Sequence, residues 1–111
     1  MKVPFKSLKL GAQRFTIEEC DESMREDAKM LGDTDSRLGR IRIVKGQPTA
    51  QMGDTLIHEI CHAVLFEAGM VWYGPEIEVV IERLSPRIAA MFKDNPKQMH
   101  ALIDLFQNED T

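Results

Sequence analysis

The hydrophobic pattern of this 111-residue chain changes at Pro48, and this change constrains the fold more than any other feature. Before Pro48, apolar and polar residues alternate in short runs, which is typical of half-buried strands. After Pro48, apolar residues recur every three to four positions, which predicts amphipathic helices. We therefore expect an α+β fold with a single domain over residues 1–111, in which a small N-terminal antiparallel sheet precedes a motif-bearing helix and two further helices.

Three runs carry the strand pattern. Residues 5–10 and 14–17 alternate on either side of a glycine, which predicts a hairpin. Residues 38–44 alternate again, and their outward arginines suit an edge strand. Between these runs, residues 32–36 have the composition of a turn, and residues 22–31 suggest at most a short, weak helix.

The first predicted helix covers residues 52–68, with Thr49 as the candidate N-cap and Gly69 as the candidate C-cap. The last predicted helix opens at residues 95–96, an Asn-Pro pair. Four apolar residues of this last helix are expected to face the core: Met99, Leu102, Ile103 and Phe106.

The second predicted helix begins at Pro75, a favoured first helical residue. Pro86 interrupts this helix, because proline cannot donate a hydrogen bond to the carbonyl four residues earlier. We therefore expect a kink there, or a restart with Ser85 as the cap. Its apolar stripe comprises Ile77, Ile81, Leu84, Ile88 and Met91.

The first predicted helix carries an HExxH motif, His-Glu-Ile-Cys-His, at residues 58–62. Residues four apart lie on one helix face, so the imidazoles of His58 and His62 can converge on one metal ion, and zinc favours such ligands. Glu59 projects to the side, where its carboxylate can accept a proton from water. A chance motif is the alternative, but burying these polar groups without partners would cost on the order of several kcal/mol, which favours a metal site.

A catalytic zinc usually has three protein ligands, so the two histidines need a third. No histidine follows at the metzincin spacing, which excludes that class. The second predicted helix offers Glu76, Glu78 and Glu82, of which the last two lie four apart on one polar strip. We expect Glu78 to be the ligand and Glu82 to be a hydrogen-bond partner of a ligand histidine, or the ligand in its place. For each glutamate, a solvated helix side chain is the alternative interpretation.

Other residues are weaker candidates. Tyr73, after the motif helix, and His100, on the last helix, are candidate oxyanion stabilisers, although packing or surface roles are commoner for such residues. Trp72 is equally ambiguous. Cys61 is expected to be a buried, inert thiol, and the two cysteines of the chain are too few for a disulfide framework.

Composition limits the classes of function. The net charge of −4 argues against sequence-independent nucleic-acid binding. The basic stretches within residues 1–17 and 37–45 are interpreted as solvated strand faces, with a groove for an acidic partner as the alternative. No apolar run approaches the ~20 residues of a membrane span, and the N-terminus lacks the apolar stretch of a secretory signal. We therefore expect a cytoplasmic protein with no membrane partner.

The segments HEICHAV, EIEVVIERL and DNP, together with the strand at residues 40–43, carry a family resemblance. Over residues 38–106 the chain resembles the small zinc-metallopeptidase-like proteins of phages and prophages, relatives of the ImmA/IrrE-type gluzincins. The resemblance implies a minimal zincin fold in the host cytoplasm, with Glu59 as catalytic base and the two motif histidines and Glu78 as zinc ligands. Pro86 departs from the family's pattern in the second helix.

Two functions of different classes follow. The first is a zinc-dependent peptidase, in which an extended peptide or protein substrate pairs with an edge strand at residues 40–44 and Glu59 activates water. The alternative is a catalytically idle zincin-fold binding module that keeps its metal and recognises a phage or host protein. The short chain favours the alternative, because little of it is left for a deep cleft or a lid. Nucleic-acid binding is a third, weaker hypothesis, and the oligomeric state stays open.

Overall fold

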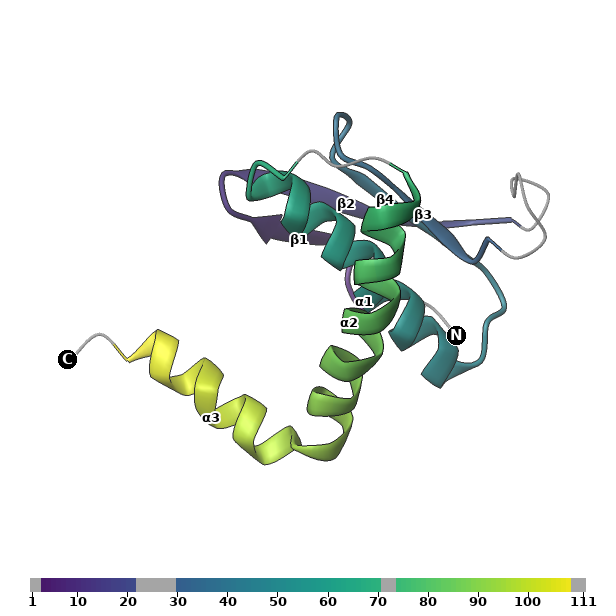
Figure 1. Ribbon diagram of the computed structural model, residues 1–111. Helices are drawn as coiled ribbons and strands as arrows, with labels where there is room; N and C mark the ends of the chain where they lie inside the picture. The colour runs from purple at the N-terminus through teal and green to yellow at the C-terminus, as the bar shows by residue number, and fades with distance from the viewer. Residues whose placement is uncertain (1–2, 22–29, 71–73, 109–111) are drawn as a thin grey trace.

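The computed structural model describes residues 3–21, 30–70 and 74–108. A four-stranded sheet is followed by three helices, which confirms the predicted α+β class. Figure 1 shows α1 and α2 packed together beside the sheet, and α3 extending away from them. The weak helix predicted over residues 22–31 falls mostly outside the described residues. Within the described ranges, no helix is both long and apolar enough to cross a lipid bilayer.

The sheet is mixed rather than antiparallel. Its order is β1-β2-β4-β3, with the bounds Ser7–Leu10 for β1, Gln13–Cys20 for β2, Gly32–Asp35 for β3 and Arg40–Val44 for β4. β1 and β2 form the predicted hairpin, and β3 pairs antiparallel with β4. β2 and β4, however, run parallel, so the prediction of a purely antiparallel sheet is wrong. A parallel pair needs a long connection, and here β3 lies within that connection.

β4 is a central strand, so its predicted edge position is wrong. It pairs with β2 on one side and with β3 on the other, and the segment predicted as a turn is β3 itself. The arginines that suggested an edge instead face acidic residues of the neighbouring strands. Arg42 is in register with Glu18 of β2 and Asp33 of β3, and its Nε donates a 2.9 Å hydrogen bond to Asp33. These cross-strand charges account for an arginine at the centre of the sheet. Arg40 and Arg42 are half-buried and, with Arg37, line a pocket, so the interpretation as a solvated strand face is not confirmed.

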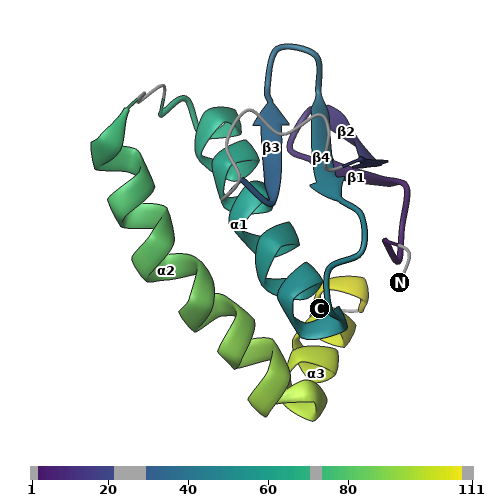
Figure 2. The ribbon, with the colours of Figure 1, turned by 90° about the vertical axis from the view of Figure 1, so that its right-hand side faces the viewer.

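The opposite face of the sheet forms the core against α1. Apolar residues of β2 and β4 alternate onto this face, as the sequence pattern predicts. The core cluster comprises Phe15, Ile17, Ile41 and Ile43 from the sheet and Met52, Leu56 and Ala63 from α1. Figure 2 shows α1 between the sheet and α2, so this helix contacts both.

Helix α1 spans Thr49–Glu67. Pro48 is its N-cap, and the threonine predicted as the cap is instead the first helical residue. Its C-cap is Ala68, one residue before the predicted Gly69. Gly69 has a φ of +80°, and the amides of Gly69 and Met70 donate to carbonyls of the last turn, so a glycine does terminate the helix. Val64 is 45% exposed, because the sheet and α2 leave one side of the helix uncovered.

Helix α2 spans Pro75–Asp94 and begins at the predicted proline. It continues through Pro86 as one helix, so the predicted restart at Ser85 does not occur. Its buried residues recur every four positions: Ile77, Ile81, Ser85 and Ala89. Leu84 and Met91, which were predicted for the stripe, are 44% and 43% exposed, because α1 covers only a narrow face of α2.

Helix α3 spans Pro96–Gln107 and buries none of its residues. The prediction that its apolar side faces the core is wrong: Leu102, Ile103 and Phe106 are exposed, and Met99 is only partly buried. The reason lies in the connection. Asn95 alone separates α2 from α3, and the following proline keeps it out of the helical region, at φ −134° and ψ 53°.

Candidate metal centre

Helix α1 places the two motif histidines on one side. The rings of His58 and His62 have centroids 5.2 Å apart and are inclined by 61°. Each side chain is about one-quarter exposed. The four-residue spacing therefore produces the predicted common face, with both imidazoles accessible to a small ligand.

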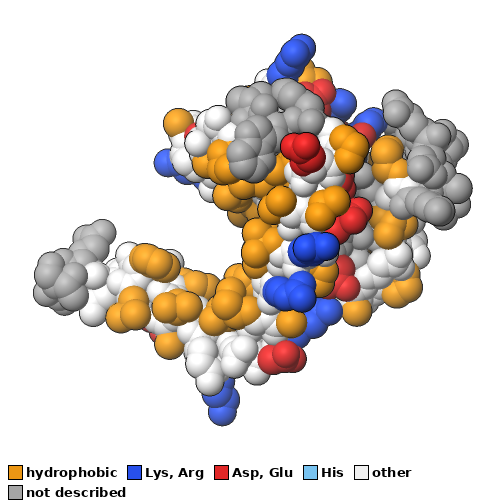
Figure 3. All heavy atoms as spheres, viewed as in Figure 1, with side chains coloured by type: hydrophobic (Ala, Val, Ile, Leu, Met, Phe, Trp, Pro, Cys, Tyr) orange, Lys and Arg blue, Asp and Glu red, His pale blue; other side chains and the backbone are white. Residues whose placement is uncertain are grey.

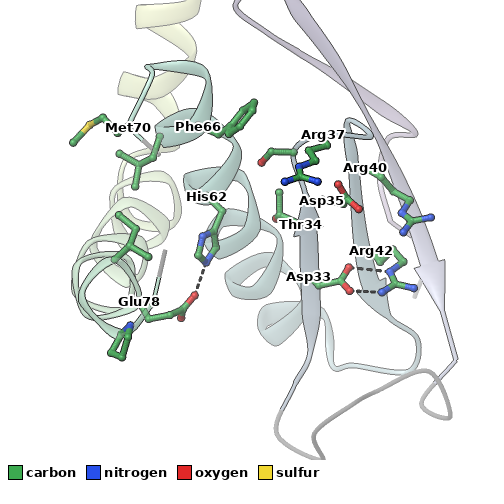
Figure 4. A pocket seen from close by; sticks show the side chains of 15 residues that line it. Asp33, Thr34, Asp35, Arg37, Arg40, Arg42, His62, Phe66, Met70 and Glu78 are labelled. Carbon is green, nitrogen blue, oxygen red and sulfur yellow. Dashed lines mark hydrogen bonds and ion pairs between the residues drawn. The ribbon is translucent and has the colours of Figure 1, made fainter. Parts of the chain in front are cut away.

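Glu78 of α2 joins the histidines from the neighbouring helix. Its carboxylate oxygens lie 2.6 Å from Nε2 of His62 and 3.5 Å from Nε2 of His58. Figure 4 shows His62 and Glu78 pointing toward each other between the two helices. One ligand atom from each of the three residues lies within 4.8 Å of the others. Around a zinc ion with tetrahedral bonds of about 2.0–2.2 Å, ligand atoms lie about 3.3 Å apart, so this group could hold a metal ion after small rotations.

The packing of α2 on α1 explains why Glu78 lies there. Ile77 and Ile81 are buried against Cys61 of α1, between the two histidines in sequence. Because Glu78 follows Ile77 directly, this packing turns its carboxylate toward the motif. Cys61 is the predicted buried thiol, and burial raises its pKa.

The other glutamates of α2 differ in position. Glu82 is exposed one turn beyond Glu78 and lines a cleft together with the histidines and Glu78. Glu76 is exposed at the start of the helix and does not line this cleft. Burial lowers the pKa of His58, while the charges of Glu78 and Glu82 oppose this shift. His58 is therefore favoured as a neutral imidazole, the form that binds a metal.

Glu59 lies beside the histidines and is only 6% exposed. The hydroxyl of Thr34 lies 2.9 Å from its carboxylate and 3.1 Å from its backbone carbonyl, and it can donate to one of them at a time. Burial raises the pKa of Glu59 to about 7; the Thr34 hydrogen bond lowers this pKa, and the charges of Glu78 and Asp33 raise it further. A carboxyl group with this pKa can take up and release a proton near neutrality.

Strand β3 sets the position of Glu59. The sequence analysis did not predict this strand. A Cβ atom at Gly32 would lie 2.8 Å from the carbonyl oxygen of Arg42 and 3.3 Å from Cγ of Glu59. The glycine thus permits α1 to approach the strand closely, and Thr34 reaches the carboxylate from the same strand. The alternation of Asp33, Thr34 and Asp35 is the one sequence signal that could have indicated a strand here.

A buried polar network joins β3 and β4 to the part of α1 that precedes the motif. The amide of Gln47 donates to the carbonyls of Leu31 and Val44, at 3.0 and 2.9 Å. The hydroxyl of Thr55 donates to the side-chain oxygen of Gln47 at 2.8 Å. These contacts hold the start of β3 and the end of β4 against the helix. Nothing in the hydrophobic periodicity marks these two polar residues as buried.

An open cleft crosses the candidate metal centre along β3. Its two halves have volumes of about 720 and 780 Å³ and share Asp33, Thr34, His62 and Glu78. The half near the end of β3 is lined in part by Arg37, Leu65, Phe66 and Met70. The half near its start is lined in part by Gln51, Asp54, Glu59 and Glu82. The short chain therefore does form a cleft, and the three candidate ligands lie along it.

The two predicted oxyanion stabilisers have different outcomes. Tyr73, like Trp72, lies outside the described residues. His100 is exposed on α3 and lines neither half of the cleft, so the structure does not bring it to the site.

No family model, curated protein or solved structure matches this chain. The resemblance to the phage zinc-metallopeptidase-like proteins therefore stays a prediction from the motif and its surroundings.

Proposed function

We propose that this protein is a zinc-dependent peptidase, with His58, His62 and Glu78 as the zinc ligands and Glu59 as the general base. The observation that carries the proposal is the convergence of the three donors beside a buried carboxylate in an open cleft. Two histidines and a glutamate are a donor set of catalytic zinc sites, in which a fourth position stays open. The donors here fit this use, because His58 is favoured in its neutral form and Glu78 reaches both rings.

Bound zinc would supply Lewis acidity toward the carbonyl group of the peptide. Glu59 removes a proton from the attacking water, whose oxygen forms the new bond to the carbonyl carbon. As the carbon–nitrogen bond breaks, Glu59 returns the proton to the departing amine. Burial raises the pKa of Glu59 in the metal-free protein and so favours its protonated form between the two transfers, while Thr34 holds the carboxylate in place.

The substrate is proposed to be an extended peptide on β3. Among the described strands, β3 pairs with β4 alone, so its second edge is available for backbone hydrogen bonds. Figure 4 shows this strand facing His62 across the cleft. The edge was predicted at β4, but β4 is paired on both sides. We therefore assign peptide pairing to β3, the edge strand, which also lies nearer the motif.

The test combines metal analysis with cleavage of a peptide library. We expect one zinc ion per chain and cleavage by the wild-type protein. Glu59→Gln should retain zinc and lose cleavage by about 100-fold or more, the scale for removing a general base. Glu76→Gln, the same change at an exposed position outside the cleft, should change neither property. A zinc-loaded wild-type protein that cleaves no peptide would overturn the catalytic proposal.

The second candidate is a metal-holding binding module. It is favoured by the exposure of Glu78, which is 44%, and by the openness of the cleft along the described residues. In this case zinc serves stability only, and Glu59→Gln leaves the function of the protein unchanged. The same variant therefore separates the two candidates.

A further inference from the structure

The two halves of the cleft differ in the charged side chains that line them. Carboxylates of α1, α2 and β3 line the half near the start of β3, and no Lys or Arg of the described ranges does so. Figure 3 shows Asp and Glu side chains along the side of α2 that faces the sheet. The half near the end of β3 contains Arg37, Arg40 and Arg42 together with aspartates of β3. The pairing of these charges decides which of them a substrate can meet.

One carboxylate in the half near the start of β3 is available to a substrate. The other carboxylates there are engaged: two belong to the candidate metal centre, Asp33 forms an ion pair with Arg42, and Asp54 lies 3.1 Å from Nζ of Lys93. Glu82 is exposed and makes no hydrogen bond or ion pair with any residue that the structure describes. Its negative charge is therefore not compensated by a neighbour.

One cation in the other half is available in the same way. Two of the three arginines there face aspartates of β3, since Arg42 pairs with Asp33 and Arg40 is in register with Asp35. Arg37, in the turn between β3 and β4, is exposed and has no hydrogen bond or ion pair within residues 3–21, 30–70 and 74–108. Figure 4 shows Arg37 at the end of β3, across the cleft from the helices of the metal centre.

We propose that Arg37 and Glu82 select the substrate: an extended peptide with an acidic residue on one side of the scissile bond and a basic residue on the other. This inference rests on the proposed function, because it names the substrate class of that site. The two halves share His62 and Glu78, so the scissile bond lies between the two charges. The order of the charges along the peptide depends on whether the peptide pairs parallel or antiparallel with β3, and both orders are tested.

The size of the effect follows from the exposure of both charges. An ion pair between exposed groups contributes up to about 5-fold to an equilibrium constant. A peptide with the opposite order of charges loses two such attractions and meets two repulsions instead, which predicts a preference of about 10-fold between the two orders. Because the preference depends on the sign of each charge, exchanging the two charges of the protein should invert it.

The experiment measures peptide binding to zinc-loaded Glu59→Gln by fluorescence anisotropy. Two labelled peptides have the same composition and carry Glu and Lys at their two ends in opposite orders. Their Kd values should differ by about 10-fold. Adding Arg37→Glu and Glu82→Lys should invert the preference. Adding Glu76→Lys and Arg83→Glu makes the same charge changes at exposed positions outside the cleft and should leave the preference unchanged.

Arg37→Glu alone is the second variant, because it changes a surface turn and leaves α2 intact. It should abolish the preference, since both halves then carry a negative charge and the two orders become equivalent. Metal analysis and circular dichroism verify that each variant keeps its zinc and its fold.

Three results overturn the inference: no measurable binding of either peptide, equal Kd values for the two orders, or a preference that remains in folded Arg37→Glu. The failure of the proposed function is distinguishable from these results. A wild-type protein that cleaves a peptide library without regard to charge keeps the peptidase proposal and overturns this inference alone. A protein that binds the two orders as expected, but whose wild-type form cleaves no peptide, overturns the peptidase proposal and supports the charge recognition.

Discussion

Replacing Glu59 by glutamine should stabilise the metal-free protein above neutral pH. Burial raises the pKa of Glu59 from 4.5 to about 7, so the folded state binds the proton more tightly than the unfolded state. This proton linkage contributes stability in full below pH about 4.5, and the contribution is lost as the pH rises through about 7. At about 1.4 kcal/mol per pKa unit, the loss is about 3 kcal/mol. Glutamine has nearly the same size and no charge at any pH, so Glu59→Gln avoids the loss.

The assay is urea unfolding of both proteins in the presence of a chelator, at pH values from about 4 to about 8. The free energy of unfolding of Glu59→Gln should exceed that of the wild-type protein by about 3 kcal/mol at the upper end and by little at the lower end. Glu76→Gln, at an exposed position, should show no such pH-dependent difference. The reasoning is refuted if Glu59→Gln is equal to or less stable than the wild-type protein at pH about 8. Added zinc should reduce the difference, because a nearby cation favours the ionised carboxylate.

Three further substitutions test the site and its support. Glu78→Gln should weaken zinc binding by at least about 10-fold in a competition titration, whereas Glu82→Gln should change it much less; equal effects would contradict the ligand assignment. Gly32→Ala should lower the free energy of unfolding by about 1–3 kcal/mol in urea titrations, because its Cβ would collide with a backbone carbonyl. Gly53→Ala, in a helix with open space around it, should instead gain about 0.5–1 kcal/mol. Thr55→Val leaves the buried glutamine oxygen without its donor and should cost about 1–3 kcal/mol, measured in the same way.

The candidate ligands could be predicted from the sequence because helical geometry is local. The spacing of His58 and His62 determines their common face whatever surrounds the helix. Predicting Glu78 as a ligand required one further inference, because its helix must pack on α1 through the side next to Glu78. The buried pair of Ile77 and Ile81 provides that packing.

The parts that could not be predicted depend on long-range contacts. β3 contains glycine and aspartates, which are poor strand formers, and it is a strand because β4 offers it a hydrogen-bonding partner. Because the sequence does not predict β3, it indicates no hydrogen-bond partner for Glu59 and does not explain why this side chain is buried. The exposed α3 shows the same limit. Its pattern predicts an apolar side, but the pattern does not say which surface covers that side.

The composition of β3 suits both a protected sheet edge and a close contact with α1. An exposed strand edge invites pairing with other chains, and natural sheets limit this hazard with short strands and charges. β3 has four residues, and Asp33 and Asp35 carry negative charge on the open face of the sheet. On the opposite face, Gly32 admits α1 and Thr34 holds Glu59. A peptide that pairs with this edge would therefore meet the histidines on one side and a charged surface on the other, which favours entry along the cleft over pairing with another sheet.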